Sequence, residues 1–247
     1  MVFAVSLQAQ EVETAPLTQH QIVQILNADN RPAEDRIRDQ ARRPDKILAF
    51  TGIAPGDTVL DLFAGGGWYT ELFSRAVGSD GKVYAQNDQV IWRFAKQGMQ
   101  ARTKDQRLDN IAIADIDVPN NSVDTAFVAL NYHDLFFTSM VRDGEVITLR
   151  DEVVDHKKVL AKLAQMLKDD GQVIIIDHAA HAGSGYEAAN TLHRIDPNIV
   201  KFHFAEAGFT LLEEAFYLRN KNDNYDTNVF DPSIRGKTDR FIFKFGK

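Results

Sequence analysis

The chain has 247 residues, of which 44% are hydrophobic and 26% charged, an ordinary globular composition with enough apolar material for a sizeable core. Its 28 Lys and Arg against 35 Asp and Glu give a net charge of −7. This balance argues against a nucleic-acid partner, because phosphate backbones are held mainly by clustered basic residues. The absence of cysteine excludes disulfides, thiolate zinc sites and cysteine nucleophiles. No apolar run approaches the ~20 residues that a membrane helix needs, so no membrane partner is expected.

The N-terminus allows two interpretations. Residues 1–7 are apolar and are followed by Gln-Ala-Gln, so residues 1–10 are either the remnant of an export signal or a frayed end. The missing basic segment favours a frayed end and a cytoplasmic protein, whereas a signal remnant would mean export to the periplasm. Beyond them, Thr18 and Gln21 fit a capping box, and Pro32 suits the first turn of a second helix. We predict that residues 1–44 form an N-terminal segment with cap helices and that residues 45–247 form the main domain.

From residue 58 onward, short apolar strands alternate with helical patterns. The strands are expected at 58–63, 81–86, 110–114, 123–130, 172–176, 209–218 and 240–245. Helices are expected at 68–76, 89–101, 153–167 and 198–206. This alternation predicts an α/β fold: a doubly wound, Rossmann-like, seven-stranded and mostly parallel sheet covered on both faces. The last two strands have no helix between them, which predicts an antiparallel edge strand.

The most informative segment is the glycine-rich turn after the first strand. The strand carries Asp61 near its end and runs through Phe63 and Ala64 into Gly65, Gly66 and Gly67, directly before a helix. Glycines let a backbone turn sharply and approach a ligand closely. In a doubly wound sheet, ligands bind beyond the carboxyl ends of the strands, where this turn lies.

This segment resembles the first motif of the class I S-adenosylmethionine-dependent methyltransferases. Asp61, Gly65 and Gly67 match it, while Phe63 stands where a glycine is usual, as in versions of the turn written Asp-x-Phe-Ala-Gly-x-Gly. The resemblance implies that Asp61 supports the loop or contacts the methionine amino group. It also implies that the backbone of Phe63, Ala64, Gly65, Gly66 and Gly67 passes beside S-adenosyl-L-methionine, the expected cofactor.

Two further positions match the pattern of this family. At the end of the second strand, where a carboxylate usually holds the ribose, this chain has Asn87 followed by Asp88, and either of them could take that role. After the third strand, the resemblance implies that Asp115 contacts the adenine amino group and that Ile116 covers the ring. A strand-end turn and a helix cap are the structural alternative for Asn87 and Asp88.

The end of the fourth strand carries Asn131, Tyr132, His133 and Asp134. In the family, methyl acceptors lie against this motif. We expect Asn131 to contact the cofactor, Tyr132 to line the acceptor pocket, and His133 to act as the catalytic general base, since a histidine can take a proton near neutral pH. The missing Pro-Pro after Asn131 speaks against a DNA-modifying enzyme.

After the fifth strand, Asp177, His178 and His181 stand at a spacing seen among metal ligands. Divalent ions used by some methyltransferases prefer an oxygen-rich shell, which cannot be assembled here, so we assign no metal. Instead we expect His178 and His181 to contact the substrate from a polar loop. Near the C-terminus, Arg235 and Arg240 either hold an anionic substrate or cap loop carbonyls.

The function favoured by this pattern is S-adenosylmethionine-dependent methyl transfer to a small-molecule acceptor. The segments around residues 177–185 and 229–241 also look like those of poorly characterised bacterial methyltransferase-like proteins, which often carry an export signal. An alternative is therefore a non-catalytic binding protein with the methyltransferase fold, supported by the missing ribose carboxylate and by possible export. A nicotinamide enzyme using the same crevice is a third possibility. The sequence does not predict the oligomeric state.

Overall fold

The computed structural model describes residues 15–114, 118–142 and 144–247. Its α-helices are α1 (Gln19–Leu26), α2 (Ala33–Ile37), α3 (Asp39–Arg42), α4 (Pro44–Thr51), α5 (Trp68–Val77), α6 (Gln89–Thr103), α7 (His156–Met166), α8 (Glu187–Leu192) and α9 (Pro197–Glu206). Its strands are β1 (Thr58–Leu62), β2 (Lys82–Gln86), β3 (Ile111–Ala114), β4 (Val123–Ala129), β5 (Ser139–Arg142), β6 (Glu145–Thr148), β7 (Leu167–His178), β8 (Thr210–Ala215) and β9 (Arg240–Gly246). Two 3-10 turns, η1 (Lys104–Gln106) and η2 (His133–Phe136), complete the described chain.

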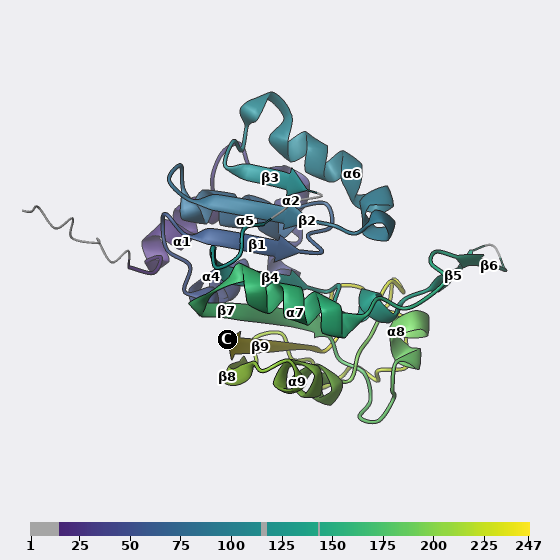
Figure 1. Cartoon of the computed structure of the whole chain (residues 1–247). Coiled ribbons are helices and arrows are strands. Elements are labelled where there is room, and N and C mark those ends of the chain that lie inside the picture. The colour runs from purple at the N-terminus through teal and green to yellow at the C-terminus, as the bar shows by residue number, and fades with distance from the viewer. Residues whose placement is uncertain (1–14, 115–117, 143) are drawn as a thin grey trace, which may run out of the picture.

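The main sheet has seven strands in the order β3-β2-β1-β4-β7-β9-β8 (Figure 1). Strands β1, β2, β3, β4 and β7 pair in parallel, and β9 runs antiparallel between β7 and the outermost strand β8. The predicted α/β fold with a mostly parallel sheet and an antiparallel pairing at its edge is confirmed. The strand order reverses direction between β1 and β4, so the crevice for a ligand lies beyond the ends of these two strands.

The strands alternate between two buried faces. In β1, Val59 joins the core formed with α1, α4 and α5, whereas Leu60 joins the core formed with α7 and α9. Successive side chains of a strand point to opposite faces, so a strand that is apolar throughout supplies both cores. The N-terminal helices therefore share one core with the sheet: Ile22 and Ile47 are fully buried in the same cluster as Phe73.

Local signals explain where the helices begin. The expected capping box is present, because Thr18 and Gln21 exchange bonds at the start of α1. Asp88 caps α6 by accepting from the Ile91 amide at 2.7 Å, and Asp155 caps α7, which therefore begins three residues later than the pattern predicted. This cap fixes the direction of the Asp88 side chain, which is one of the two candidate ribose ligands.

A short antiparallel hairpin, β5–β6, extends away from the body of the molecule between β4 and α7 (Figure 1). The sequence gives no signal for this hairpin, since its strands are only four residues long and exposed. Its exposed apolar side chains include Val141 and Val146. Among the described helices, none combines the length and hydrophobicity needed to cross a bilayer.

Candidate functional site

The glycine-rich turn joins β1 to α5 and is held by two asparagines. The side-chain amide of Asn131 donates to the Phe63 carbonyl at 2.5 Å. Asn87 accepts from the Gly65 amide at 2.8 Å and donates to the Gly65 carbonyl at 3.2 Å. Phe63 has a φ of 57°, a left-handed conformation that glycine usually occupies and that a bulky residue rarely adopts. The phenylalanine in the usual glycine position thus keeps the backbone conformation of a glycine.

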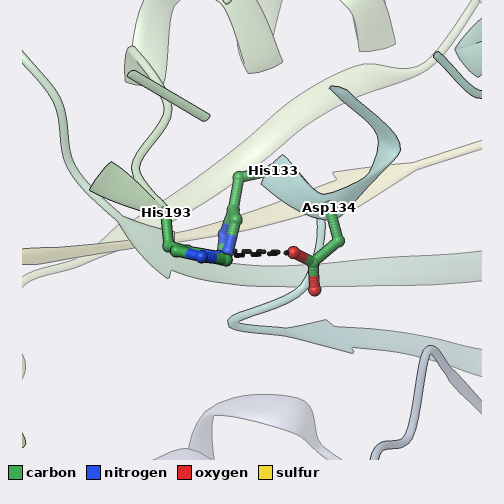
Figure 2. A group of neighbouring side chains, drawn as sticks. All are labelled: His133, Asp134 and His193. Carbon is green, nitrogen blue, oxygen red and sulfur yellow. Dashed lines mark ion pairs between the residues drawn. The ribbon is translucent and has the colours of Figure 1, made fainter. Parts of the chain in front are cut away.

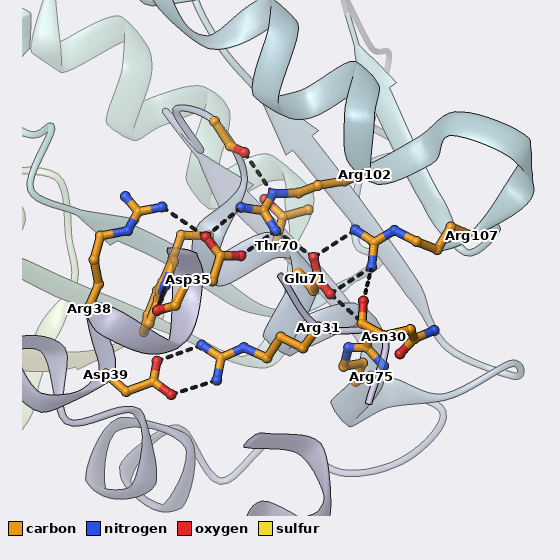
Figure 3. Close-up of polar contacts among 12 residues, drawn as sticks. Asn30, Arg31, Asp35, Arg38, Asp39, Thr70, Glu71, Arg75, Arg102 and Arg107 are labelled. Carbon is orange, nitrogen blue, oxygen red and sulfur yellow. Dashed lines mark hydrogen bonds and ion pairs between the residues drawn. The ribbon is translucent and has the colours of Figure 1, made fainter. Parts of the chain in front are cut away.

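Beneath the turn lies a buried network of ion pairs (Figure 3). Arg102 from α6 donates to the Gly66 carbonyl at 2.7 Å and pairs with Glu71 of α5 and with Asp35 of α2. Glu71 also accepts from Arg75 and Arg107, each at 2.8 Å. Burial raises the pKa of Glu71, but hydrogen bonds from Arg107 and Arg75 and the charge of Arg102 bring this pKa down to about 2. The network fixes the turn to three separate helices.

Asp61 is buried at the end of β1 and accepts a hydrogen bond from the Thr70 hydroxyl at 2.5 Å. Burial raises its pKa to about 7, against the Thr70 hydrogen bond and the charge of Arg42, which lower it. Asp61 is also among the residues that line the crevice, with 2% of its surface exposed. A cation placed beside it would favour the ionised carboxylate.

The crevice has two lobes, which share Gly65, Gly66, Leu130, Asn131, His133 and Phe230. The first lobe, of about 490 Å³, lies between the N-terminal helices and the segment before β9. The second, of about 740 Å³, lies between α6 and the start of the β5–β6 hairpin and is lined by apolar residues that include Val90, Ile91 and Phe137. The hollow beside the glycine turn is therefore not filled by the protein's own side chains.

Four arginines line the first lobe: Arg38, Arg42, Arg235 and Arg240. Arg38 pairs with Asp35, but no ion pair joins Arg42, Arg235 or Arg240 to a carboxylate within the part of the chain that the structure describes. The Arg42 guanidinium lies 4.7 Å from the Trp68 ring centroid and 5.6 Å from that of Tyr69.

In this arginine lobe (Arg38, Arg42, Arg235 and Arg240), Arg240 is buried, Arg42 is half-buried, and Arg38 and Arg235 are exposed. Arg240 is 6% exposed and donates to the Ala41 carbonyl at 2.7 Å, while its buried Nε has no described partner. Burial, with smaller contributions from the charges of Arg38 and Arg240, lowers the pKa of Arg42 to about 10, against Tyr69 and Asp35, which raise it. A buried arginine without an ion pair favours an anionic partner, and its guanidinium is suited to a carboxylate or a phosphate.

His133 lies in η2, where β4 ends, and is held by a carboxylate that the sequence did not connect to it. Asp177 of β7 lies 2.8 Å from His133 Nδ1 and also accepts from the His133 amide at 2.9 Å. Asp134 approaches Nε2 at 3.3 Å (Figure 2). Burial lowers the pKa of His133, but the charges of Asp177 and Asp134 raise it to about 9. An imidazolium cannot accept a further proton, so the predicted base role requires that Nε2 first lose its proton.

The other predicted site residues are placed as follows. His178 lines the first lobe, and its Nδ1 lies 2.7 Å from the Thr238 hydroxyl. Tyr132 does not reach the crevice, because η2 turns it into the core, where its hydroxyl lies 3.1 Å from His203 Nδ1. His181 is exposed, lies outside both lobes and approaches Asp226 at 3.1 Å. The expectation that Tyr132 and His181 contact the substrate from the crevice therefore disagrees with this geometry.

The ribose and adenine positions remain predictions. Neither Asn87 nor Asp88 is among the residues that line the lobes: Asn87 holds Gly65, and Asp88 caps α6 and pairs with Arg150 at 2.9 Å. The structural alternative considered for both residues matches these contacts. Asp115 and Ile116 lie outside the described residues.

Sequence reasoning missed Arg42, Arg102 and His193 as residues of this region. Arg42 sits on a short cap helix in a run of charged residues, and no local signal shows that its side chain lines a crevice. His193 is separated from His133 by 60 residues along the chain, and its φ of 56° at the end of α8 has no sequence signature.

Comparison with known proteins agrees with this architecture. No protein-family profile matches the chain. The ubiquinone/menaquinone biosynthesis C-methyltransferase UbiE of Teredinibacter turnerae is 26% identical over 153 residues, which cover 59% of this chain and 53% of that protein. The 2-phytyl-1,4-naphtoquinone methyltransferase of Trichormus variabilis is 27% identical over 136 residues, covering 54% of this chain and 52% of that protein. The match thus spans about half the length of these curated relatives.

Solved structures share the fold over most of the chain. A SAM-dependent methyltransferase from Aquifex aeolicus superposes with a TM-score of 0.58 at 20% identity, covering 93% of this chain and 98% of the other. An S-adenosylmethionine-dependent methyltransferase from Mesorhizobium loti gives 0.54 at 14% identity, covering 85% and 100%. The chain has the class I methyltransferase fold. The resemblance stated from the motifs is confirmed at the level of this fold.

Proposed function

We propose that this protein transfers a methyl group from S-adenosyl-L-methionine to a small anionic acceptor. The observation that carries the proposal is the open two-lobed crevice beside the glycine turn, at the switch point of a class I methyltransferase fold. The methionine end of the cofactor would lie in the first lobe, with its ammonium at Asp61 and its carboxylate at Arg42. The adenosyl end would lie in the second lobe, against apolar residues such as Val90 and Ile91.

The charges of the first lobe support an anionic acceptor. The methionine tail carries one carboxylate and one ammonium, and the sulfonium adds a second positive charge. One carboxylate can compensate only one of the three arginines that lack a described carboxylate partner, Arg42, Arg235 and Arg240. Arg240 is paired with His178 across β7 and β9, and Arg235 lines the same lobe, so a carboxylate or phosphate of the acceptor could bind these two arginines.

Methyl transfer from S-adenosyl-L-methionine requires few catalytic groups. The sulfonium methyl is already electrophilic, so the enzyme must exclude water and align the acceptor atom with the carbon–sulfur bond. The acceptor atom forms a bond to the methyl carbon while the carbon–sulfur bond breaks, leaving S-adenosylhomocysteine. An acceptor that begins as a neutral hydroxyl or amine must also lose a proton, which Nε2 of His133 could take once it is deprotonated.

Calorimetry with S-adenosylhomocysteine tests the cofactor assignment, and we expect saturable binding of one equivalent. No saturable binding would contradict the proposal, and tight binding of NADH by fluorescence titration would favour a nicotinamide enzyme instead. Transfer of a labelled methyl group from S-adenosylmethionine to a small-molecule library, separated by anion exchange, tests the acceptor. We expect the labelled product to be retained as an anion; cofactor binding without transfer to any acceptor would favour the non-catalytic alternative.

A further inference from the structure

Three side chains meet at the boundary between the two lobes, and of these the function above uses only His133. His133 and Asp134 come from η2 and His193 from the end of α8, and Figure 2 shows them turned toward one another. The Asp134 Oδ1 atom lies 3.3 Å from His133 Nε2 and 3.6 Å from His193 Nδ1. One ligand atom from each residue lies within 4.8 Å of the other two. All three side chains line the second lobe.

These separations suit a metal ion. Metal–ligand bonds of about 2.0–2.2 Å in a tetrahedral site place neighbouring ligand atoms about 3.4 Å apart. The two measured distances lie on either side of that value. They are longer than ordinary charge-assisted hydrogen bonds, so the side chains are close without satisfying one another.

The surroundings add a second, independent feature of a metal site. Asp177 binds the opposite ring nitrogen, His133 Nδ1, at 2.8 Å, and so fixes the ring with Nε2 facing the other two residues. A carboxylate on the far nitrogen of a ligating histidine is a usual outer contact of protein metal sites. His193 is packed between Phe137 and Phe230, with ring centroids 4.4 and 4.8 Å away, so its imidazole is held against an apolar wall.

We propose that His133, Asp134 and His193 bind one divalent transition-metal ion of the zinc class. Two imidazoles and one carboxylate favour zinc, iron, cobalt or nickel over magnesium or calcium, which prefer an all-oxygen shell. Three protein ligands leave at least one coordination position open, and that position faces the crevice. Binding replaces the proton on His133 Nε2, as ligand deprotonation accompanies metal binding in general.

A metal could bind here whether or not the cofactor does, but a metal bound to His133 Nε2 would exclude the base role proposed for that nitrogen. An ion at this place would lie beside the end of β4, where an oxygen of a bound molecule could fill its open position. It would then act as a Lewis acid that lowers the pKa of that oxygen.

Calorimetry with zinc chloride on the tag-free, chelator-treated full chain tests the site. We expect one equivalent of zinc to bind to the wild type. We expect Asp134→Asn and His193→Asn each to weaken zinc binding by about tenfold or more. Asparagine is chosen at 193 because it tolerates the left-handed backbone there. The matched control is His181→Asn, which removes a histidine from another His–Asp pair, at 3.1 Å and on the surface, and should bind zinc as the wild type does.

Cobalt(II) provides a readout that needs no variant. We expect it to shift the imidazole NMR signals of His133 and His193 strongly and to leave that of His181 unaffected. The proposal is overturned if the wild type shows no saturable zinc binding, if both asparagine variants bind zinc like the wild type, or if cobalt perturbs His181 in place of His193. Any variant that fails thermal-unfolding controls is set aside, and the NMR result on the wild type then decides.

Discussion

Two groups of arginines flank the glycine turn, and they differ in what neutralises them. Under the turn, Arg102, Arg75 and Arg107 all pair with the fully buried Glu71. Beside the turn, Arg42 contacts two aromatic rings and Arg240 a backbone carbonyl, and neither forms a described ion pair with a carboxylate. A compensated buried charge network holds helices in place, whereas arginines buried without an ion pair are a cost to the empty protein that an anionic ligand can remove. We therefore expect the first group to stabilise the fold and the second to bind a ligand.

The largest effect on stability is expected from removing Glu71, which pairs with Arg75, Arg102 and Arg107. Glu71→Ala leaves three arginines around an empty buried position, and removing one partner of a buried pair typically costs about 3–5 kcal/mol. Urea unfolding measures the loss. The control is Glu152→Ala, since Glu152 is exposed and has no described ion pair, and its effect should stay within about 0.5 kcal/mol. Equal losses in both variants would show that the network does not stabilise the fold.

Acid should weaken the same group. The pKa of Glu71 is lowered from 4.5 to about 2 in the folded state, so its contribution to the free energy of unfolding is complete above the unfolded pKa and is lost as the pH falls toward 2. We expect the thermal midpoint of the wild type to drop over this range. In Glu71→Gln that part of the drop should be missing; an unchanged acid profile would contradict the assignment.

Substitutions of Arg42 and Arg240, which form no described ion pair, should change ligand affinity more than stability. Arg42→Gln removes the charge proposed to hold the methionine carboxylate, and we expect the Kd for S-adenosylhomocysteine to rise about tenfold, which corresponds to about 1.4 kcal/mol. The fold should lose little, because Arg42 forms no ion pair with a described carboxylate. Arg43→Gln is the matched control: this neighbour is exposed and pairs with Asp45, so the variant should bind the ligand normally.

Arg235→Gln divides the arginine lobe further. Arg235 is assigned to the acceptor, so this variant should leave the Kd for S-adenosylhomocysteine unchanged and lower kcat/KM for the anionic acceptor by about tenfold or less, since Arg240 remains. Steady-state kinetics at saturating cofactor measure the effect. A loss of cofactor binding in this variant would instead indicate that Arg235 contacts the methionine end of the cofactor.

The smallest effect concerns Asp61. Because the pKa of Asp61 is raised to about 7, its carboxyl is protonated in a fraction of the molecules near neutral pH. In these molecules Asp61 must lose its proton before a carboxylate can face the cofactor ammonium. Cofactor affinity should therefore rise with pH, by no more than about tenfold per unit, between about pH 6 and pH 7.5. Calorimetry across this range measures it. Asp61→Asn should bind more weakly and without this pH dependence; a pH-dependent variant would assign the effect to another group.

Local patterns in the sequence predicted the elements well where they carried strong signals. The apolar strands, the glycine turn and the cap at Thr18 depend on neighbours within a few residues, and the edge pairing of the last two strands followed from the lack of a helical pattern between them. The hairpin β5–β6 was missed because four-residue exposed strands leave no burial pattern. The polar composition of residues 220–228 gives no sign of burial, yet Asp223 is 5% exposed and pairs with the fully buried Arg194 at 2.8 Å.

The sequence by itself determined the class of fold and the position of the crevice, because hydrophobic periodicity and a glycine turn at the end of a strand are local properties of the chain. Only the tertiary structure decided which polar side chains face that crevice. Tyr132 was turned into the core, Asp177 was brought to His133, and Arg42 was left without a carboxylate. The physical reason is that burial, pairing and pKa depend on groups far apart in the chain, which meet only when the sheet and its helices have packed.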